Sequence, residues 1–228
     1  MNNNFLAIIP AREGSKRIKS KNLLNFNSKP LIYWTIKEAL KIKEIDKVIV
    51  SSDSKKILNI SKNYGIKYFI KRPKILSRDK SSSWDVVKHV IKILKKNNER
   101  YKNIILLQPT SPLRKAKHIL EAIRIYKNKN LNGLISLTTT EKPISWNFST
   151  NKNLDIKFFK KFKNFYKKNK IKYDVIINGA IYIFKTELIK KKNFFYKKKI
   201  QGYLMKREFS VDVDNYVDLK LANFFLKH

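Results

Sequence analysis

Short apolar stretches with the length of β-strands alternate along this chain with segments in which apolar residues recur at helical spacing. The pattern predicts strands over residues 5–10, 47–53, 66–70, 103–109 and 133–139, and helices over residues 30–42, 54–64, 84–96 and 115–127. This strand–helix order favours an α/β fold with a mainly parallel sheet and helices on both faces. In such a sheet, ligands bind beyond the carboxyl ends of the strands, so the polar residues that follow each strand are the candidates for function.

The alternation breaks near residue 140. Residues 141–174 carry aromatic residues among many lysines without a clear period, and they are interpreted either as an interaction arm or as a lysine-rich surface insertion. Strand patterning resumes over residues 180–184, 202–206 and 210–214, and a helix is predicted over residues 215–226. We expect one domain over residues 1–228 with an excursion at 141–174, because no linker rich in proline or glycine interrupts the chain.

Composition narrows the classes of protein. A hydrophobic fraction of 43% over 228 residues suffices for a buried core and excludes a wholly disordered chain. The absence of cysteine excludes disulfides, thiolate metal sites and a cysteine nucleophile. The first apolar stretch is too short for a signal peptide, and no run of about 18 apolar residues indicates a membrane helix, so a cytoplasmic location is expected.

The net charge of +35 raises the question of a polyanionic partner. Of the 52 basic residues only eight are arginine, and lysine is abundant together with asparagine and isoleucine, as in A/T-rich coding sequences. We therefore favour compositional drift on solvated faces over a dedicated polyanion-binding surface. A nucleic-acid-binding α/β protein that uses residues 157–172 and 190–199 remains the alternative from another functional class.

A basic loop, AREGSKRIKSKN (residues 11–22), follows the first predicted strand. Backbone N–H groups near Gly14 and Ser15, together with Arg12 and Lys21, suit the binding of a polyphosphate. The loop is neither a Walker A motif nor a G-x-G-x-x-G fingerprint, because the required glycines are missing. Its position after a strand favours function over an ordinary solvated loop.

Two further segments carry candidate chemistry. In SVDVD, Asp212 and Asp214 would face the same side of a strand and could bind Mg²⁺; the alternative is an acidic turn in which Asp214 caps the last helix. In LLQPTSPLR, Gln108 ends the clearest strand and could recognise hydroxyls or a carboxylate. The alternative there is a turn in which Ser111 caps a helix.

Taken together, the motifs IIPAREGSKRIKSKN, KPLIYWTI, VIVSSD, KRPKILSRD followed by SSS, LLQPTSPLR, NGAIYIF and SVDVD resemble the acylneuraminate cytidylyltransferases, the CMP-sialic acid synthetase family. The resemblance extends from about residue 5 to 226. It implies a Rossmann-like nucleotidyltransferase that uses CTP and Mg²⁺ to activate a nonulosonic acid with release of pyrophosphate. It also implies a homodimer formed through the excursion.

The resemblance implies a role for each matching residue. Those expected at the nucleotide are Arg12, Ser15, Lys21, Asn22, Arg72 and Ser82. Those expected at the sugar acid are Gln108, Asn178 and Tyr182, with Phe194 and Phe195 offered by the partner subunit to the acyl group. Asp212 and Asp214 are expected to hold the metal, and Arg12, Lys21 and Asp212 to act in catalysis.

The sequence departs from the family at several positions. Relatives often carry glycine where this chain has Glu13 and Arg17, and an Arg-Pro pair where it has Ile176 and Ile177. Lys168 or Lys172 could replace that arginine at the sugar carboxylate. Legionaminic or pseudaminic acid is therefore an alternative substrate, and LQPTSPLR favours the sialic and legionaminic groups. The nucleic-acid-binding alternative gives no role to the aspartate pair Asp212 and Asp214 or to the strand end at LQPTSPLR.

Overall fold

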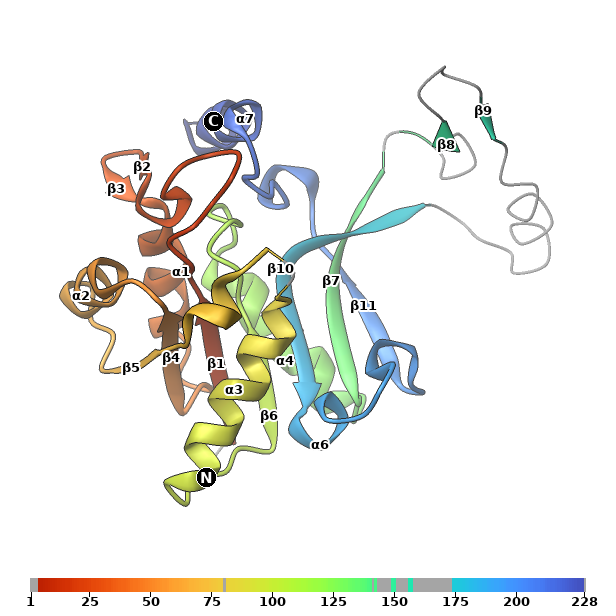
Figure 1. The fold of residues 1–228 in the computed structure, drawn as a ribbon. Coiled ribbons are helices and arrows are strands. Elements are labelled where there is room, and N and C mark those ends of the chain that lie inside the picture. Colours follow the sequence, from red (N-terminus) through yellow and green to blue (C-terminus); the bar gives the residue numbers. More distant parts are fainter. Residues whose placement is uncertain are drawn as a thin grey trace.

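A computed structural model of the chain describes residues 4–79, 81–140, 142, 149–150, 156–157 and 174–227. These residues form a fold around a seven-stranded sheet, whose strands lie in the order β11-β7-β10-β6-β1-β4-β5 (Figure 1). These strands are β1 (Phe5–Pro10), β4 (Lys47–Ser52), β5 (Tyr68–Lys71), β6 (Asn103–Leu106), β7 (Gly133–Thr139), β10 (Val175–Lys185) and β11 (Ile200–Leu204). Strand β10 runs antiparallel to both neighbours, and the other pairs in the sheet are parallel. The predicted Rossmann-like α/β class is confirmed.

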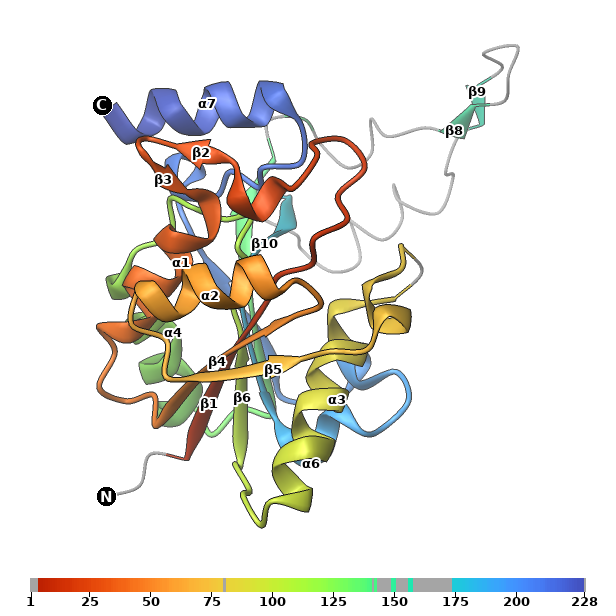
Figure 2. The ribbon, with the colours of Figure 1, turned by 60° about the vertical axis from the view of Figure 1, so that its left-hand side comes forward.

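Helices cover both faces of the sheet, as the sequence pattern predicts (Figure 2). One face packs against α1 (Leu31–Leu40), α2 (Lys55–Asn63) and α4 (Ala116–Asn128), and the other against α3 (Ser83–Lys96) and the short α6 (Thr186–Ile189). The alternation within β1 explains the two layers, because Ala7 and Ile9 join the first cluster and Leu6 and Ile8 the second. No helix in the described ranges has both the length and the apolar character needed to cross a membrane.

A third apolar cluster lies beyond the carboxyl ends of the central strands. It joins the basic loop to α7 (Tyr216–Lys227), through Ile18, Val213 and Ala222. Two short hairpin strands, β2 (Asn25–Phe26) and β3 (Lys29–Pro30), complete this region (Figure 2). The cluster fixes the basic loop against the C-terminal segment that carries the two candidate aspartates.

Several predicted boundaries need correction. Residues 107–109 lie outside β6, and β5 begins two residues later than predicted. The strand predicted over residues 180–184 is the end of the eleven-residue β10, and that predicted over 202–206 is observed at Ile200–Leu204. The strand predicted over 210–214 is wrong, because only one backbone hydrogen bond, from Val213 N to Thr110 O at 2.7 Å, ties it to a neighbour.

The expected excursion leaves the sheet after β7 and returns at β10, at the edge where the parallel strands end. Within it, the two-residue strands β8 (Ser149–Thr150) and β9 (Ile156–Lys157) pair with each other. Most of residues 141–174, including Lys168 and Lys172, lie outside the described residues. The division into one domain with an interaction arm therefore stays a prediction.

Candidate active site

A polar cavity of about 500 Å³ lies at the carboxyl ends of β1, β5 and β6. It brings together four segments that are remote in sequence: the basic loop after β1, the segment from Arg72 to α3, the residues that follow β6, and the C-terminal turn. Every predicted nucleotide-binding or metal-binding residue lines it, together with Gln108: Arg12, Ser15, Lys21, Asn22, Arg72, Ser82, Asp212 and Asp214. The rule that ligands bind beyond strand ends thus correctly located the cavity.

The basic loop is held in shape by Asn22, which is buried. Its side-chain amide donates a hydrogen bond to the carbonyl of Arg12 at 2.7 Å, so the two ends of the loop are tied together. The Arg12 guanidinium donates to Asp79 Oδ1 at 2.9 Å, and Lys16 Nζ lies 2.7 Å from Asp79 Oδ2. These cations therefore face the cavity in a defined geometry, and Asn22 acts on them through the backbone.

Two other cations of the loop reach the C-terminal turn. Lys21 Nζ contacts Asp214 Oδ1 at 2.7 Å, and Arg17 Nη1 contacts Asp214 Oδ2 at 2.8 Å. Burial would raise the pKa of Asp214, but its hydrogen bond and charge contact with Lys21, helped by Arg17, hold that pKa below its usual value. Asp214 is consequently a fully ionised carboxylate between the phosphate-binding candidates and the rest of the cavity.

Asp212 has a different environment from Asp214. Val211 and Val213 are buried in the third cluster, so the alternating side chains of Asp212 and Asp214 project into the cavity even without a strand. No described lysine or arginine lies within ion-pair distance of Asp212. Burial raises the pKa of Asp212 from its usual value, the Thr110 hydroxyl opposes this rise, and the nearby negative charge of Asp214 adds to it.

The alternative role of Asp214 as the cap of the last helix is wrong. The Asn215 side chain accepts hydrogen bonds from the backbone N–H groups of Val217 and Asp218, at 2.8 and 3.0 Å. The Asp218 carboxylate accepts from the N–H groups of Asp214 and Asn215 in return. This reciprocal cap is made by the neighbours, and it leaves the Asp214 side chain for the cavity.

Asp212 and Asp214 form a donor set that fits a hard divalent cation. Both carboxylates line one cavity, one of them lacks a cation partner among the described residues, and their mutual repulsion is what a bound cation would relieve. The described residues contain no cluster of three or more acidic, histidine or cysteine ligands, so a metal here would share its ligands with water and substrate.

The opposite wall of the cavity carries Arg72 and Ser82. Arg72 is 5% exposed, and its Nη2 atom lies 3.8 Å from Asp53 Oδ1. Burial lowers the pKa of Arg72 from its usual value, although Asp53 opposes this effect. The Ser82 hydroxyl caps α3 in a reciprocal arrangement with Asp85, so part of its bonding capacity serves the fold.

Gln108 and Gly179 meet at the floor of the site. Gly179 has a φ of +75°, and a Cβ atom there would lie 3.4 Å from Asp212 Oδ2 and 3.9 Å from Gln108 Cδ. A side chain at position 179 would therefore be strained by the positive φ, while its Cβ atom would make ordinary van der Waals contacts with Asp212 and Gln108.

Asn178 does not line the polar cavity, and its predicted contact with the sugar acid stays a prediction. Its side-chain oxygen accepts hydrogen bonds from Ser136 Oγ at 2.6 Å and Ala180 N at 3.2 Å, and its amide nitrogen donates to Ser210 Oγ at 2.9 Å. These contacts hold the irregularity in β10 between Ile177 and Tyr182 against β7. Asn178 is therefore a positioning residue for the turn that leads to Asp212.

Tyr182, Phe194 and Phe195 also lie outside the cavity lining. They form one aromatic cluster with Trp84 and Phe184 of the same chain, with ring centroids 4.9 Å apart for Trp84 and Phe194. Phe194 is buried in the core of its own subunit, so this packing gives no support to its predicted role toward a partner. Burial and then the charge of Asp212 raise the pKa of Tyr182 to about 12.

Arg114 is a fully buried arginine that stabilises the backbone next to the polar cavity. It donates to the carbonyl oxygens of Gln108 at 3.2 Å and Ala180 at 2.7 Å, and to Thr35 Oγ1 at 2.6 Å. Burial lowers its pKa to about 9, opposed by Glu38. The sequence placed Arg114 in a candidate motif, and the structure shows that it holds β6 and β10 together at the site and does not reach the cavity.

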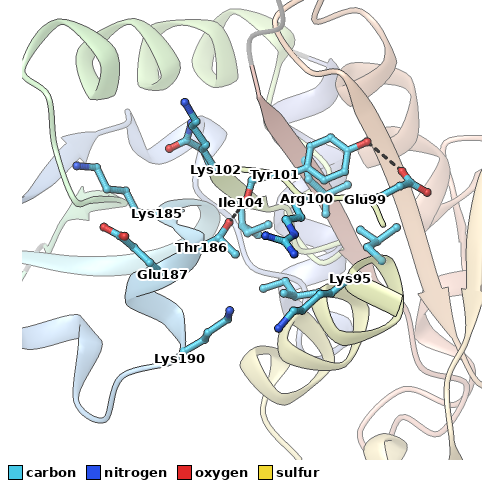
Figure 3. A pocket seen from close by; sticks show the side chains of 14 residues that line it. Lys95, Glu99, Arg100, Tyr101, Lys102, Ile104, Lys185, Thr186, Glu187 and Lys190 are labelled. Atoms are coloured by element: carbon cyan, nitrogen blue, oxygen red, sulfur yellow. Dashed lines mark hydrogen bonds between the residues drawn. The ribbon is translucent and has the colours of Figure 1, made fainter. Parts of the chain in front are cut away.

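A second cavity of about 630 Å³ lies at the other end of the sheet (Figure 3). Apolar side chains of Leu6, Ile91, Leu94 and Ile104 line it, and basic side chains such as Lys95 and Lys190 surround it. It is larger than the polar cavity but lies at the amino-terminal ends of β1 and β6 and contains none of the predicted site residues. The predicted site residues are therefore found at the smaller, polar cavity.

Sequence reasoning missed Asp79 as a part of the site. Acidic residues are scarce in this chain, with 17 in 228 residues, and Asp79 lies in the quoted KRPKILSRD motif. The rarity of acidic residues could have singled out Asp79 as a candidate. Its pairing with Arg12 and Lys16, however, spans more than 60 residues and depends on the fold.

Comparisons with known proteins agree with this geometry. A family model described as cytidylyltransferase matches residues 6–227. The N-acylneuraminate cytidylyltransferase of Escherichia coli O18:K1:H7 is 36% identical over 224 residues, covering 97% of this chain and 52% of that protein. The pseudaminic acid cytidylyltransferase of Campylobacter jejuni is 32% identical over 226 residues, which cover 97% of this chain and 96% of that protein. The CMP-N,N'-diacetyllegionaminic acid synthase of Legionella pneumophila is also 32% identical, with coverages of 96% and 94%.

The chain thus spans about half the length of the N-acylneuraminate relative and nearly all of the other two. Among solved structures, a CMP:2-keto-3-deoxy-manno-octonic acid synthetase complexed with CTP superposes with a TM-score of 0.70 at 17% identity, covering 98% of both chains. That likeness confirms the fold. Nothing in these comparisons supports the nucleic-acid-binding alternative. The polar cavity, the fold and the family model lead to one conclusion: the chain belongs to the cytidylyltransferase family.

Proposed function

We propose that this protein transfers CMP from CTP to the anomeric hydroxyl of a nonulosonic acid and releases pyrophosphate. The observation that carries the proposal is the convergence, in one cavity, of the cations of the basic loop with the carboxylates of Asp212 and Asp214. The relatives named for N-acylneuraminate, pseudaminic and diacetyllegionaminic acids support this class of acceptor.

In the proposed reaction, the anomeric oxygen bonds to the α-phosphorus of CTP while the bond to pyrophosphate breaks. Arg12 and Lys21 hold the triphosphate, and their charges stabilise the negative charge that develops on the leaving group. The hydroxyl proton passes to Asp212, directly or through a bound water. Positioning and charge stabilisation thus account for catalysis without a covalent intermediate.

Asp212 and Asp214 would hold Mg²⁺ in this proposal. The ion, when bound, supplies neutralisation of phosphate oxygens during the displacement. Since Lys21 and Arg17 already contact Asp214, these cations are placed to engage both the carboxylate and the neighbouring phosphates. Gln108, at the floor beside Gly179, is placed to hydrogen-bond the sugar acid.

A homodimer is the second part of the proposal. Ile177 and Leu204 are 52% and 49% exposed, and both pair in register with Leu137 on β7, the strand that lies between β10 and β11, so the three side chains share one face. Exposed apolar rows of this kind are frequent at protein interfaces. The row lies at the base of the excursion, so contact there would place residues 141–174 beside a neighbouring subunit.

The decisive experiment for the reaction is pyrophosphate release from each of CTP, UTP, ATP and GTP, with and without a panel of nonulosonic acids. We expect release only with CTP, only with Mg²⁺ and only with an acceptor acid. RNA binding measured in a salt titration tests the other class. Absence of CTP-dependent release with every acid, together with tight salt-sensitive RNA binding, would contradict the proposal.

A further inference from the structure

Asp79 occupies a position at which its charge opposes the proposed substrate. It lies in the turn between the short helix at Lys74–Ser77 and α3, and its side chain faces the cavity across from the basic loop. Each of its oxygens contacts a different cation: Oδ1 lies 2.9 Å from Arg12 Nη1 and Oδ2 lies 2.7 Å from Lys16 Nζ. Hydrogen bonds from Lys16 and then Arg12 hold the pKa of Asp79 below its usual value, so the group is charged at neutral pH.

A carboxylate that bridges two cations resembles a bound phosphate group. Both groups present negatively charged oxygens to the same guanidinium and ammonium donors. The contacts that Asp79 makes with Arg12 and Lys16 therefore use donors that a triphosphate requires. All three side chains are at least one-third exposed, so solvent and a ligand can compete for these contacts at modest cost.

The turn does not depend on the Asp79 side chain for its shape. Ser81 N donates to the carbonyl of Arg78 at 3.0 Å, and the Ser81 hydroxyl donates to the carbonyl of Ile75 at 2.8 Å. These bonds stay intact when the carboxylate is replaced by an amide. A change at position 79 therefore alters the charge in the cavity while the wall that carries it is retained.

We infer that Asp79 is a counter-ion of the nucleotide site, which contacts Arg12 and Lys16 in the ligand-free protein and is displaced by the triphosphate of the nucleotide. The inference rests on the proposed function, because it takes the nucleotide to bind at these cations. Asp79 lowers the affinity for CTP and for pyrophosphate alike, because each must replace its carboxylate. Weaker retention of pyrophosphate favours product release after transfer.

The test is calorimetric titration of the whole chain with CTP and, separately, with pyrophosphate in the presence of Mg²⁺. Asp79→Asn keeps the size of the side chain and removes its charge. We expect it to bind both ligands about three- to tenfold more tightly than the unchanged protein, as an exposed ion pair is lost. Glu187→Gln, which removes one negative charge at the opposite end of the sheet, should leave both affinities unchanged.

The sign of the effect separates this role from a structural one, because damage to the cavity or loss of Arg12 alignment weakens binding. Unchanged or weaker binding by Asp79→Asn, when the unchanged protein binds both ligands, would overturn the inference and leave the proposed function standing. A similar gain in Glu187→Gln would assign the effect to net charge and also overturn it. If the unchanged protein binds neither ligand, the proposed function fails as well.

Discussion

At the scale of single residues, the candidate site separates side chains that line the cavity from side chains that hold the surrounding backbone in place. Arg12, Lys21 and Asp212 face the cavity, whereas Asn178 and Arg114 use their hydrogen-bonding capacity within the fold. Both kinds occur in motifs of similar polarity, so residue type did not distinguish them. The distinction depends on whether the fold supplies partners for each polar atom, which only the tertiary structure shows.

Gln108→Ala tests the residue assigned to the sugar acid. A half-buried amide that pairs with substrate discriminates strongly, because its loss leaves polar groups unmatched. We expect the KM for the acid to rise about ten- to a hundredfold, with a much smaller change in the KM for CTP. The measurement is a matrix of initial rates in which both substrates are varied. Gln201→Ala, on the edge strand β11, is the matched control, and equal loss on both substrates would show that Gln108 supports the site as a whole.

At the scale of elements, periodicity in the sequence correctly predicted the existence of the main strands and helices, but not the ends of β6 or the state of residues 210–214. Alternating apolar residues in SVDVD arise because Val211 and Val213 pack into the third cluster. The segment lacks a strand because a single backbone bond to Thr110 joins it to a neighbour. The pattern of apolar residues indicates which side of a segment is buried. A β-strand also requires a neighbouring strand for backbone hydrogen bonds, and the pattern does not specify that neighbour.

The start of α4 gives a prediction at this scale. His118 is 6% exposed, accepts a hydrogen bond from Lys115 N through Nδ1 and packs on Phe209. Burial, with a smaller contribution from Lys117, lowers its pKa to about 4 from a usual value of 6.5. The unfolded chain therefore binds a proton at higher pH than the folded chain, so stability falls as the pH falls from about 6.5 to 4.

His118→Gln should remove this contribution, since glutamine can accept the same backbone hydrogen bond without titrating. We expect the difference in the free energy of unfolding between pH 7 and pH 4 to be smaller by up to about 3 kcal/mol than in the unchanged protein. Urea unfolding at several pH values measures it. Identical pH dependence in both proteins would show that His118 is not held neutral by its burial.

At the scale of the whole molecule, the strand–helix order was enough to predict the α/β class and the edge of the sheet that carries the site. It did not reveal that β10 runs antiparallel, because seven of the eleven residues of β10 are buried and a buried apolar pattern does not depend on strand direction. It also did not bring Asp79 to Arg12, since that contact depends on how the loops after β1 and β5 face each other. The charge of +35 carried no information about the site beyond favouring anions.

Removal of residues 145–170 tests the proposed homodimer. If the excursion joins two subunits, the shortened chain should be monomeric and lose most of its activity, because the neighbour no longer completes the site. Light scattering after size-exclusion chromatography gives the mass, and pyrophosphate release gives the activity. Leu204→Asn, which keeps the excursion and changes the exposed apolar row, is the companion variant. An active monomer after the deletion would contradict the dimer.

The measurement closest to the central claim is the turnover of Asp212→Asn. One cavity joins the candidate phosphate-binding cations to a carboxylate pair, and Asp212 is the member of that pair without a cation partner among the described residues. Initial rates of pyrophosphate release at saturating CTP, acceptor acid and Mg²⁺ should fall at least about a thousandfold, as charge stabilisation worth several kcal/mol is lost. Glu187→Gln should keep the normal rate, and circular dichroism should show both variants folded. A folded Asp212→Asn protein with near-normal turnover would contradict the account.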